Sequence, residues 1–323
     1  MIRQHGKLTF LSFLLVVLCG NTFAQKIPVI PLDLDSLITV GYATESLKTL
    51  SGSVEKITEK QMNKDQVTNP LEAIRGRVPG LTIQRGTNGP AALDAVRLRG
   101  TTSLTSGNDP LIIVDGVFGD LSMLTSIYPT DIESFTILKD ASETAQYGSR
   151  GASGVIEVTT KKGMQGRTQV AYNGSFGIST VYKNLKMLSG DEFRSVASER
   201  GISILDKGNN TNFQKEIQQT GLQQNHHVAF YGGSSTSSYR VSLGFMDRQG
   251  VILNEDMKNF TSNMNMNQKM FDGFFDCELG MFGSILKNHN LVDYQKTFYS
   301  AATFNPTYPN HKDPVTNSWD GIT

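Results

Sequence analysis

The sequence predicts a compact α+β domain followed by long antiparallel strands of the kind that build a transmembrane β-barrel. Three observations lead to this prediction. Of the 323 residues only 38% are hydrophobic and 19% charged, and 31 are Gly, which favours short strands and turns over a helical bundle. Helix starts and short apolar runs alternate between residues 58 and 163. From residue 164 onward, apolar and polar residues alternate over stretches of about ten residues.

Residues 1–24 are predicted to be a cleaved export signal. Arg3 and Lys7 precede an apolar run over residues 8–18, and small residues at Thr22 and Ala24 suit a signal peptidase. The run is too short for a permanent membrane helix. Removing two bases and no acid lowers the formal net charge from zero to −2. A charge near zero, without a basic excess, gives no sign of nucleic-acid binding.

Residues 25–57 are predicted to be a flexible tether. Pro28 and Pro31 keep its start from forming a helix. A β-prone segment follows, made of Leu37, Ile38, Thr39, Val40, Gly41 and Tyr42. Such a segment can add itself as a strand to the open sheet edge of a partner. From these residues alone, the first strand of the next domain is the preferred alternative.

Residues 58–163 are predicted to form the α+β domain. Asn69-Pro70 starts a helix, with Pro at its first position. Asp140 and Glu143 are predicted to form a capping box for a short helix that stops at Gly148. Strands are predicted at 96–100, at 111–114 with both faces covered, at 131–138 with alternating faces, and at 154–160.

Residues 164–323 contain five candidate strands. One parity is apolar, for example Val170 and Tyr172 or Val241 and Leu243, and the other is polar. Short turns near 233–237 and 271–273 alternate with longer excursions at about 180–221, 249–258 and from 288. Turns that are alternately short and long are typical of an outer-membrane barrel. The alternative, a soluble β-sandwich with one wet face, does not predict these loop lengths.

Catalytic and metal-binding patterns are weak in this chain. The glycine-rich stretch 148–154 follows a helix and has no Lys-Ser/Thr pair, so it does not match a phosphate-binding loop. His226 and His227 are neighbours on a strand, so their side chains point to opposite faces and cannot share a metal. Cys277 lies on an apolar parity. The sequence therefore predicts no enzyme, no metal site and no cofactor.

Several motifs resemble the plug of the TonB-dependent outer-membrane receptors. The amino-acid sequence of residues 139–163, together with Asp115-Gly116, resembles the SusC/RagA branch of that family. The resemblance runs from about residue 37 to the C-terminus. It implies an α+β plug domain (58–163) followed by antiparallel strands of an incomplete transmembrane β-barrel (164–323). The plug-motif residues are Arg97, Arg99, Gly100, Asp115, Gly116, Lys139, Asp140, Tyr147, Gly148, Arg150, Gly151, Gly154, Lys162 and Gly163.

The resemblance also implies a function, nutrient uptake through the outer membrane with the plug facing the periplasm. Leu37–Tyr42 becomes the expected TonB-contacting segment, and a SusD-like surface lipoprotein, membrane lipid and an oligosaccharide or peptide substrate are the other expected partners. A plugged barrel needs about 22 strands. Five cannot close, so the chain is expected to be a fragment unable to transport alone. The alternative function is a secreted β-rich binding or adhesion protein.

Overall fold

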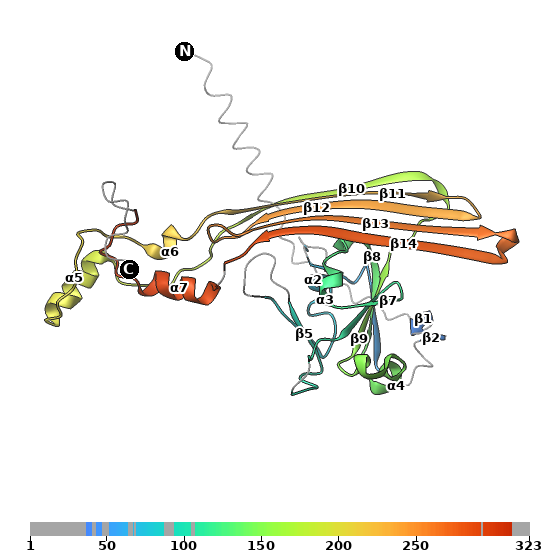
Figure 1. Ribbon diagram of the computed structural model, residues 1–323, viewed down its shortest axis with the longest axis horizontal. Coiled ribbons are helices and arrows are strands. Elements are labelled where there is room, and N and C mark those ends of the chain that lie inside the picture. Colours follow the sequence, from blue (N-terminus) through green and yellow to red (C-terminus); the bar gives the residue numbers. More distant parts are fainter. Residues whose placement is uncertain are drawn as a thin grey trace, which may run out of the picture. The chain divides into compact units, whose positions relative to one another are not determined.

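The computed structural model describes residues 37–40, 43–46, 52–63, 67, 69–86, 94–104, 107–291 and 293–311 (Figure 1). The expected export signal, most of the tether, and Gly41 and Tyr42 of the β-prone segment lie outside these residues. No helix in the described ranges combines the length and apolar character needed to cross a membrane.

The described part of the β-prone segment forms a short hairpin. Leu37–Val40 (β1) pairs antiparallel with Ala43–Ser46 (β2), with Leu37 opposite Ser46 and Val40 opposite Ala43. These two strands form a sheet of their own. β1 is therefore not a strand of the five-stranded sheet that follows.

The α+β domain is built on a five-stranded sheet with the order β3-β8-β9-β6-β7. Its strands are Val54–Thr58 (β3), Leu111–Val114 (β6), Val117–Gly119 (β7), Ile132–Leu138 (β8) and Val155–Thr160 (β9). β6 and β9 run parallel and the other pairs are antiparallel. A separate hairpin joins Leu81–Gln84 (β4) to Ala95–Leu98 (β5). The helical segments are Pro70–Ile74 (α2), Leu121–Leu124 (α3), Ala141–Thr144 (α4) and the 3₁₀ turns Pro129–Asp131 (η1) and Ala145–Gly151 (η2).

Two apolar clusters hold this domain together, a large one and a smaller one made of Leu111, Ile113, Leu138 and Val155. Phe135, Ile112 and Ile156 from three adjacent strands are fully buried, as is Ile74 of α2. α2 begins as predicted, because the Asn69 side chain accepts a hydrogen bond from the backbone N–H of Leu71 and Pro70 takes the first turn. All four residues of β6 are buried, as the continuous apolar run predicts.

Two expectations for this domain are wrong. β8 was predicted to alternate between buried and exposed residues, but all its residues except Glu133 are buried. Phe135 and Ile137 pack in one apolar cluster and Leu138, on the opposite face, packs in another, so both faces of β8 are covered. The capping box is also absent, because Asp140 precedes α4 without making a side-chain cap. α4 itself ends at Thr144, and the η2 turn that follows is kinked at Gly148, whose φ is 59°.

The remaining strands form one large sheet in which sequence neighbours pair (Figure 1). They are Gly166–Ser179 (β10), Gly221–Gly233 (β11), Ser237–Gln249 (β12), Asp256–Met270 (β13) and Phe275–His289 (β14), all antiparallel. The 3₁₀ turn Phe271–Gly273 (η3) joins β13 to β14. Gly190–Glu199 (α5) and Phe213–Glu216 (α6) lie in the connection after β10, and Tyr294–Thr303 (α7) follows β14. The five predicted strands are confirmed, as are the long connection after β10 and the short turns after β11 and β13. The excursion predicted at about 249–258 is shorter than expected, because β12 continues to Gln249 and β13 already begins at Asp256.

The two faces of the large sheet differ in chemistry and in burial. Residues on the apolar parity are exposed, for example Phe176 (62%), Leu243 (39%) and Met281 (59%). The polar parity of β11, β12 and β13 is buried, with His227 at 2% and Asn263 at 6%. This arrangement is the reverse of a soluble protein, in which apolar side chains lie inside. Within the described residues β10 and β14 each have one neighbouring strand, so the sheet is open.

Candidate functional site

The polar face of the large sheet is buried because the α+β domain binds to it through Asp131. This residue ends η1, directly before β8, and its side chain is 3% exposed. The carboxylate accepts hydrogen bonds from His227 Nε2 at 3.0 Å, Arg240 Nη2 at 2.9 Å and Ser242 Oγ at 2.6 Å. The donors come from the adjacent strands β11 and β12. One buried carboxylate therefore connects the domain to two strands.

The three donors keep the Asp131 carboxylate ionised. Burial acts to raise its pKa, but the hydrogen bonds from His227, Ser242 and Arg240 together outweigh burial and hold the pKa below its usual value. Arg240, whose side chain is 9% exposed, supplies a permanent positive charge. The Arg240 guanidinium also lies 5.5 Å from the centre of the Tyr231 ring. The interface thus contains a buried ion pair with supporting contacts on both sides.

An aromatic contact lies beside this ion pair. The Tyr128 ring stacks on the His227 imidazole with ring centres 4.6 Å apart and an angle of 22° between the planes. Burial, aided by the negative charge of Asp131, raises the pKa of the Tyr128 hydroxyl to about 12, so this side chain stays neutral. Gly244 leaves the space for the ring, since a Cβ there would overlap Tyr128.

Further polar contacts extend the interface along the sheet. Asn259 Nδ2 donates to the Thr125 carbonyl at 3.1 Å, and Asn265 Nδ2 donates to Thr160 Oγ1 at 3.1 Å. Where the chain leaves the domain, Lys162 pairs with Glu278 of β14. Gly163 lies against the backbone of Tyr239, where a Cβ would collide. Two of the predicted plug-motif residues, Lys162 and Gly163, are therefore part of this interface.

Other plug-motif residues stabilise the domain internally. Asp115 Oδ1 accepts from the Thr160 backbone N–H at 2.9 Å, and Oδ2 accepts from Thr160 Oγ1 at 2.6 Å. These bonds join the β6–β7 turn to the end of β9. The turn itself uses positive φ angles at Asp115 (46°) and Gly116 (84°), which suits a tight hairpin. The Tyr147 hydroxyl donates to the Glu157 carboxylate of β9.

Asp140 and Glu143 bind the backbone at the start of the described domain instead of capping α4. Asp140 Oδ2 accepts from the Ser53 N–H at 2.5 Å, and Glu143 Oε1 accepts from the Gly52 N–H at 3.1 Å. Arg99 forms an ion pair with Asp140. The Ser53 N–H, followed by Arg99, holds the pKa of Asp140 below its usual value. We call this arrangement of Gly52, Ser53, Arg99, Asp140 and Glu143 the entry clamp.

Lys139 reinforces the entry clamp from the same strand end. Its ammonium pairs with Glu55 Oε2 of β3 at 2.6 Å, and only 6% of the Lys139 side chain is exposed. Its backbone N–H donates to the Ser53 carbonyl at 3.4 Å. Lys139 and Asp140 are both predicted plug-motif residues. In the structure both bind the chain where it enters β3.

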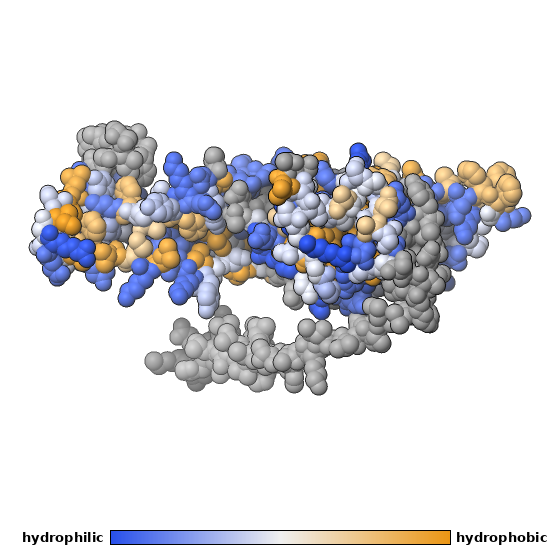
Figure 2. Space-filling view, turned by 90° about the horizontal axis from the view of Figure 1, so that it is seen from below, coloured by the Kyte–Doolittle hydropathy of each residue, from blue (hydrophilic) through white to orange (hydrophobic). Residues whose placement is uncertain are grey.

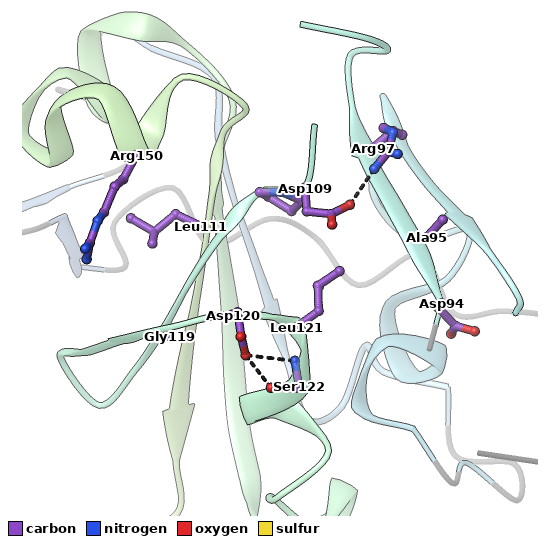
Figure 3. Close-up of a pocket in the computed structure, with 11 residues that line it drawn as sticks. Asp94, Ala95, Arg97, Asp109, Leu111, Gly119, Asp120, Leu121, Ser122 and Arg150 are labelled. Atoms are coloured by element: carbon purple, nitrogen blue, oxygen red, sulfur yellow. Dashed lines mark hydrogen bonds and ion pairs between the residues drawn. The ribbon is translucent and has the colours of Figure 1, made fainter. Parts of the chain in front are cut away.

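Arg97 and Arg150 line a pocket of about 560 Å³ between the β4–β5 hairpin and the β6–β7 hairpin (Figure 3). Arg97 forms an ion pair with Asp109, and Asp120 caps α3 through the Ser122 and Met123 N–H groups. Figure 3 draws both interactions as dashed lines where they join the residues shown. The remaining plug-motif glycines lie at turns: Gly100 (φ 96°), Gly148 (φ 59°), Gly151, where a Cβ would meet the Thr144 carbonyl, and Gly154 (φ 90°).

Sequence reasoning missed the Asp131 contact, although a signal was present. His227 and Arg240 lie on the polar parity of strands with an apolar opposite face. A permanent charge on a covered face needs an opposite charge, and Asp131 is the first residue of a predicted strand of the other domain, 131–138. The described part of the predicted TonB-contacting segment, Leu37–Val40, forms β1. Its role as a TonB contact stays a prediction.

An α+β domain held by polar contacts against one face of an antiparallel sheet defines the plug and wall of a TonB-dependent receptor. The family model of the TonB-dependent receptor plug domain matches residues 46–155. TonB-dependent receptor SusC of Bacteroides thetaiotaomicron is 34% identical over 294 residues, which are 87% of this chain and 29% of SusC. TonB-dependent receptor P3 of Formosa agariphila is 35% identical over 266 residues, 82% of this chain and 26% of that receptor. The chain thus spans less than a third of the length of these two relatives.

A solved structure of a transporter is also similar to this chain. The RagAB peptide importer in its open-open state matches with a TM-score of 0.73 at 26% identity, covering 80% of this chain and 33% of that one. The chain belongs to the SusC/RagA-like branch of the TonB-dependent receptors. Its relatives are receptors and transporters, not enzymes. From here on the α+β domain is called the plug and the large sheet the wall.

Proposed function

We propose that this chain supplies the plug and part of the wall of a TonB-dependent outer-membrane receptor that takes up a glycan or a peptide. The observation that supports this most is the buried contact of Asp131 with His227, Arg240 and Ser242. It holds a separately folded domain against the polar side of a sheet whose other side is apolar and exposed. A secreted binding protein gives no reason for that reversal.

The proposal assigns each part of the chain a place in uptake. In this proposal residues 1–24 direct export and the tether ends before residue 52, not at 57 as expected from the sequence, because β3 (54–58) is a strand of the plug sheet. Residues 52–163 form the plug facing the periplasm, and 164–323 contribute wall strands in the outer membrane. TonB binds Leu37–Tyr42 and supplies energy from the inner membrane. β1 already has strand geometry in this segment, which is the geometry that strand addition requires.

The other proposed partners follow from the relatives. RagAB is described as a peptide importer, and we propose peptides or oligosaccharides as the substrate class here. A SusD-like surface lipoprotein is the proposed partner at the outer surface. Uptake in this scheme is a conformational process driven by TonB, and neither a cofactor nor an enzymatic step is part of it.

Deleting Leu37–Tyr42 tests the proposal. The deletion is made in a receptor, called here the completed receptor, in which residues 1–323 are joined to the strands that follow the matching region of SusC. We expect energised uptake to be lost and surface binding of substrate to remain, because only the TonB contact is removed. Deleting the equally long stretch 25–30 is the matched control and should leave uptake intact. Equal uptake by the Leu37–Tyr42 deletion would contradict the proposal.

A further inference from the structure

Glu255 is a buried acid without a partner in the part of the chain that the structure describes. It ends the turn between β12 and β13, and only 2% of its surface is exposed. Its Oε1 atom makes no hydrogen bond to any described residue. Burial raises the pKa of this carboxyl, and no described residue acts against burial. A buried acid without a partner destabilises a fold, so it needs an explanation.

The position of Glu255 places it on the inner side of the wall, away from the plug contacts. On β13 it shares the parity of Asn259 and Thr261, which are both buried. Asn259 contacts the plug at the Thr125 carbonyl. Glu255 lies four residues further from the η3 turn, or ~13 Å at ~3.3 Å per residue. That end of the wall carries the long connections, which are extracellular in a membrane barrel. In the proposed receptor, Glu255 therefore faces the side from which a substrate approaches the plug.

The positive charges near Glu255 in the sheet are engaged elsewhere. Lys258, on the opposite face of β13, pairs with an acid of β12 at 3.5 Å. His289 of β14 pairs with Asp256 at 2.7 Å. Arg248, on the inner face of β12, interacts with two acids of the plug. Within the described ranges these bases leave the Glu255 carboxyl uncompensated.

The start of α7 brings aromatic side chains to this carboxyl. Burial, aided by the negative charge of Glu255, raises the pKa of the Tyr294 hydroxyl, so Tyr294 lies within reach of that charge. Phe298, one helical turn further on, packs against Tyr294 with ring centres 4.8 Å apart. No residue of α7 is buried, so the helix can move aside at little cost. Figure 2 shows hydrophobic and hydrophilic side chains intermixed at the end of the molecule where α7 lies, which suits a surface that a polar ligand reaches.

A carboxylate beside two aromatic rings is a combination that binds cations. The carboxylate supplies the opposite charge and accepts charge-assisted hydrogen bonds. The faces of the rings attract a positive group through their quadrupole. A peptide offers such groups, namely the ammonium of lysine or of its N-terminus and the guanidinium of arginine. An oligosaccharide without charged groups offers none.

We infer that Glu255, together with Tyr294 and Phe298, binds a positively charged group of a peptide substrate, and that α7 moves aside to admit it. This inference rests on the proposed uptake function. It selects a cationic peptide from the two substrate classes that the proposed function leaves open.

Calorimetric titration of the completed receptor in detergent tests the site with two probes. The probes are tri-lysine and tri-norleucine, both acetylated and amidated, so that they differ only in the side-chain ammonium groups. We expect the receptor to bind tri-lysine ~10–100-fold more tightly than tri-norleucine. Glu255→Gln should remove this preference. Asp256→Asn is the matched control and should keep it, because Asp256 is the neighbouring acid and pairs with His289.

Hydrogen exchange in α7 tests the empty site without a ligand. An unpaired buried carboxyl weakens the closed position of α7, so Glu255→Gln should slow exchange along this helix. Faster exchange in Glu255→Gln would mean that a base of the remaining wall pairs with Glu255, because breaking a buried pair is destabilising. That result would overturn the inference.

The other outcomes separate the inference from the proposed function. Equal binding of the two peptides by the unaltered receptor, or an unchanged preference in Glu255→Gln, overturns the inference and leaves the proposed function standing. Binding of Ca²⁺ at Glu255 that tri-lysine does not displace assigns the site to a metal ion and overturns it too. Uptake of tri-lysine that does not need Leu37–Tyr42 contradicts the proposed function instead.

Discussion

Replacing Asp131 by Ala is expected to release the plug from the wall more readily than any other single change in the interface. The substitution removes the one carboxylate that faces His227, Arg240 and Ser242. It leaves Arg240, 9% exposed, without a counter-charge. The plug core around Phe135 does not include the Asp131 side chain, so we expect the plug itself to stay folded.

The magnitude follows from opposing contributions. Three hydrogen bonds to a charged group are each worth ~1.5–3 kcal/mol. Burying the carboxylate costs several kcal/mol, which offsets part of this stabilisation, and this cost is absent in the Ala variant. Breaking a buried pair by removing one partner costs ~3–5 kcal/mol in measured cases. We therefore expect docking of the plug to weaken by ~3–5 kcal/mol, which is a factor of ~10² to ~4 × 10³ in the undocked population.

Thiol labelling of the covered face measures this population. Thr261 lies on the polar face of β13 and is 3% exposed, so the thiol of a Thr261→Cys variant reacts with a water-soluble reagent only when the plug moves away. In the completed receptor with Cys277→Ser, Asp131→Ala should raise the labelling rate by a factor of ~10² to ~4 × 10³. Asp120→Ala, which removes the cap of α3, is the comparison for a change inside the plug that leaves the Asp131 contact in place; since Thr125 at the end of α3 accepts from Asn259 of the wall, we expect it to raise the labelling rate far less than Asp131→Ala.

The double variant Asp131→Ala/Arg240→Ala sharpens the test. If the ion pair is the source of the effect, removing both charges should cost less than the sum of the two single changes, because no charge is left unpaired. Labelling at position 261 that is as slow in Asp131→Ala as in Asp120→Ala would refute the reasoning. So would costs that add fully in the double variant.

Two further predictions concern the plug carboxylates. Asp140→Asn should speed hydrogen exchange at the Ser53 N–H and along β3, and exchange in β9 should stay unchanged. Asp109→Asn is the control. Faster exchange confined to α4 would instead support the interpretation of Asp140 as a helix cap. Acidification should destabilise the docked plug, because the pKa of Asp131 is lower in the folded protein than in the unfolded chain. Its contribution is complete above the unfolded value, about 4, and is lost as the pH falls through the lower folded value. The urea midpoint of the plug, followed from neutral to acid pH, measures this loss, and a midpoint that rises on acidification would contradict it.

The sequence was sufficient for those features that depend on local patterns. The continuous apolar run of β6 predicts burial on both faces, and Asn69-Pro70 predicts the start of α2. The alternation of β10 to β14 and their loop lengths predict the wall, because one face of each strand meets a different environment from the other. These predictions hold because each depends only on a few residues that are neighbours in the sequence.

What the sequence could not provide depends on contacts between distant residues. Asp140 satisfies the local pattern of a helix cap, but the Ser53 N–H, 87 residues away, competes successfully for its carboxylate. β8 carries alternating polar residues such as Ser134 and Thr136, yet both are buried, because the face that they share with Leu138 is covered by a second apolar cluster. Asp131 meets Arg240 across 109 residues. Periodicity and capping rules contain no information about such pairs.

Thiol labelling at Val241 tests the central claim most directly, namely that the apolar side of the wall faces lipid and its polar side faces the plug. Val241 lies on the outward parity of β12, between Arg240 and Ser242, which both bind Asp131. In intact membranes carrying the completed receptor, we expect Val241→Cys to resist a water-soluble reagent and to react with a lipid-soluble one. Labelling by neither reagent would place Val241 in a protein core and contradict the assignment of these strands to a membrane wall.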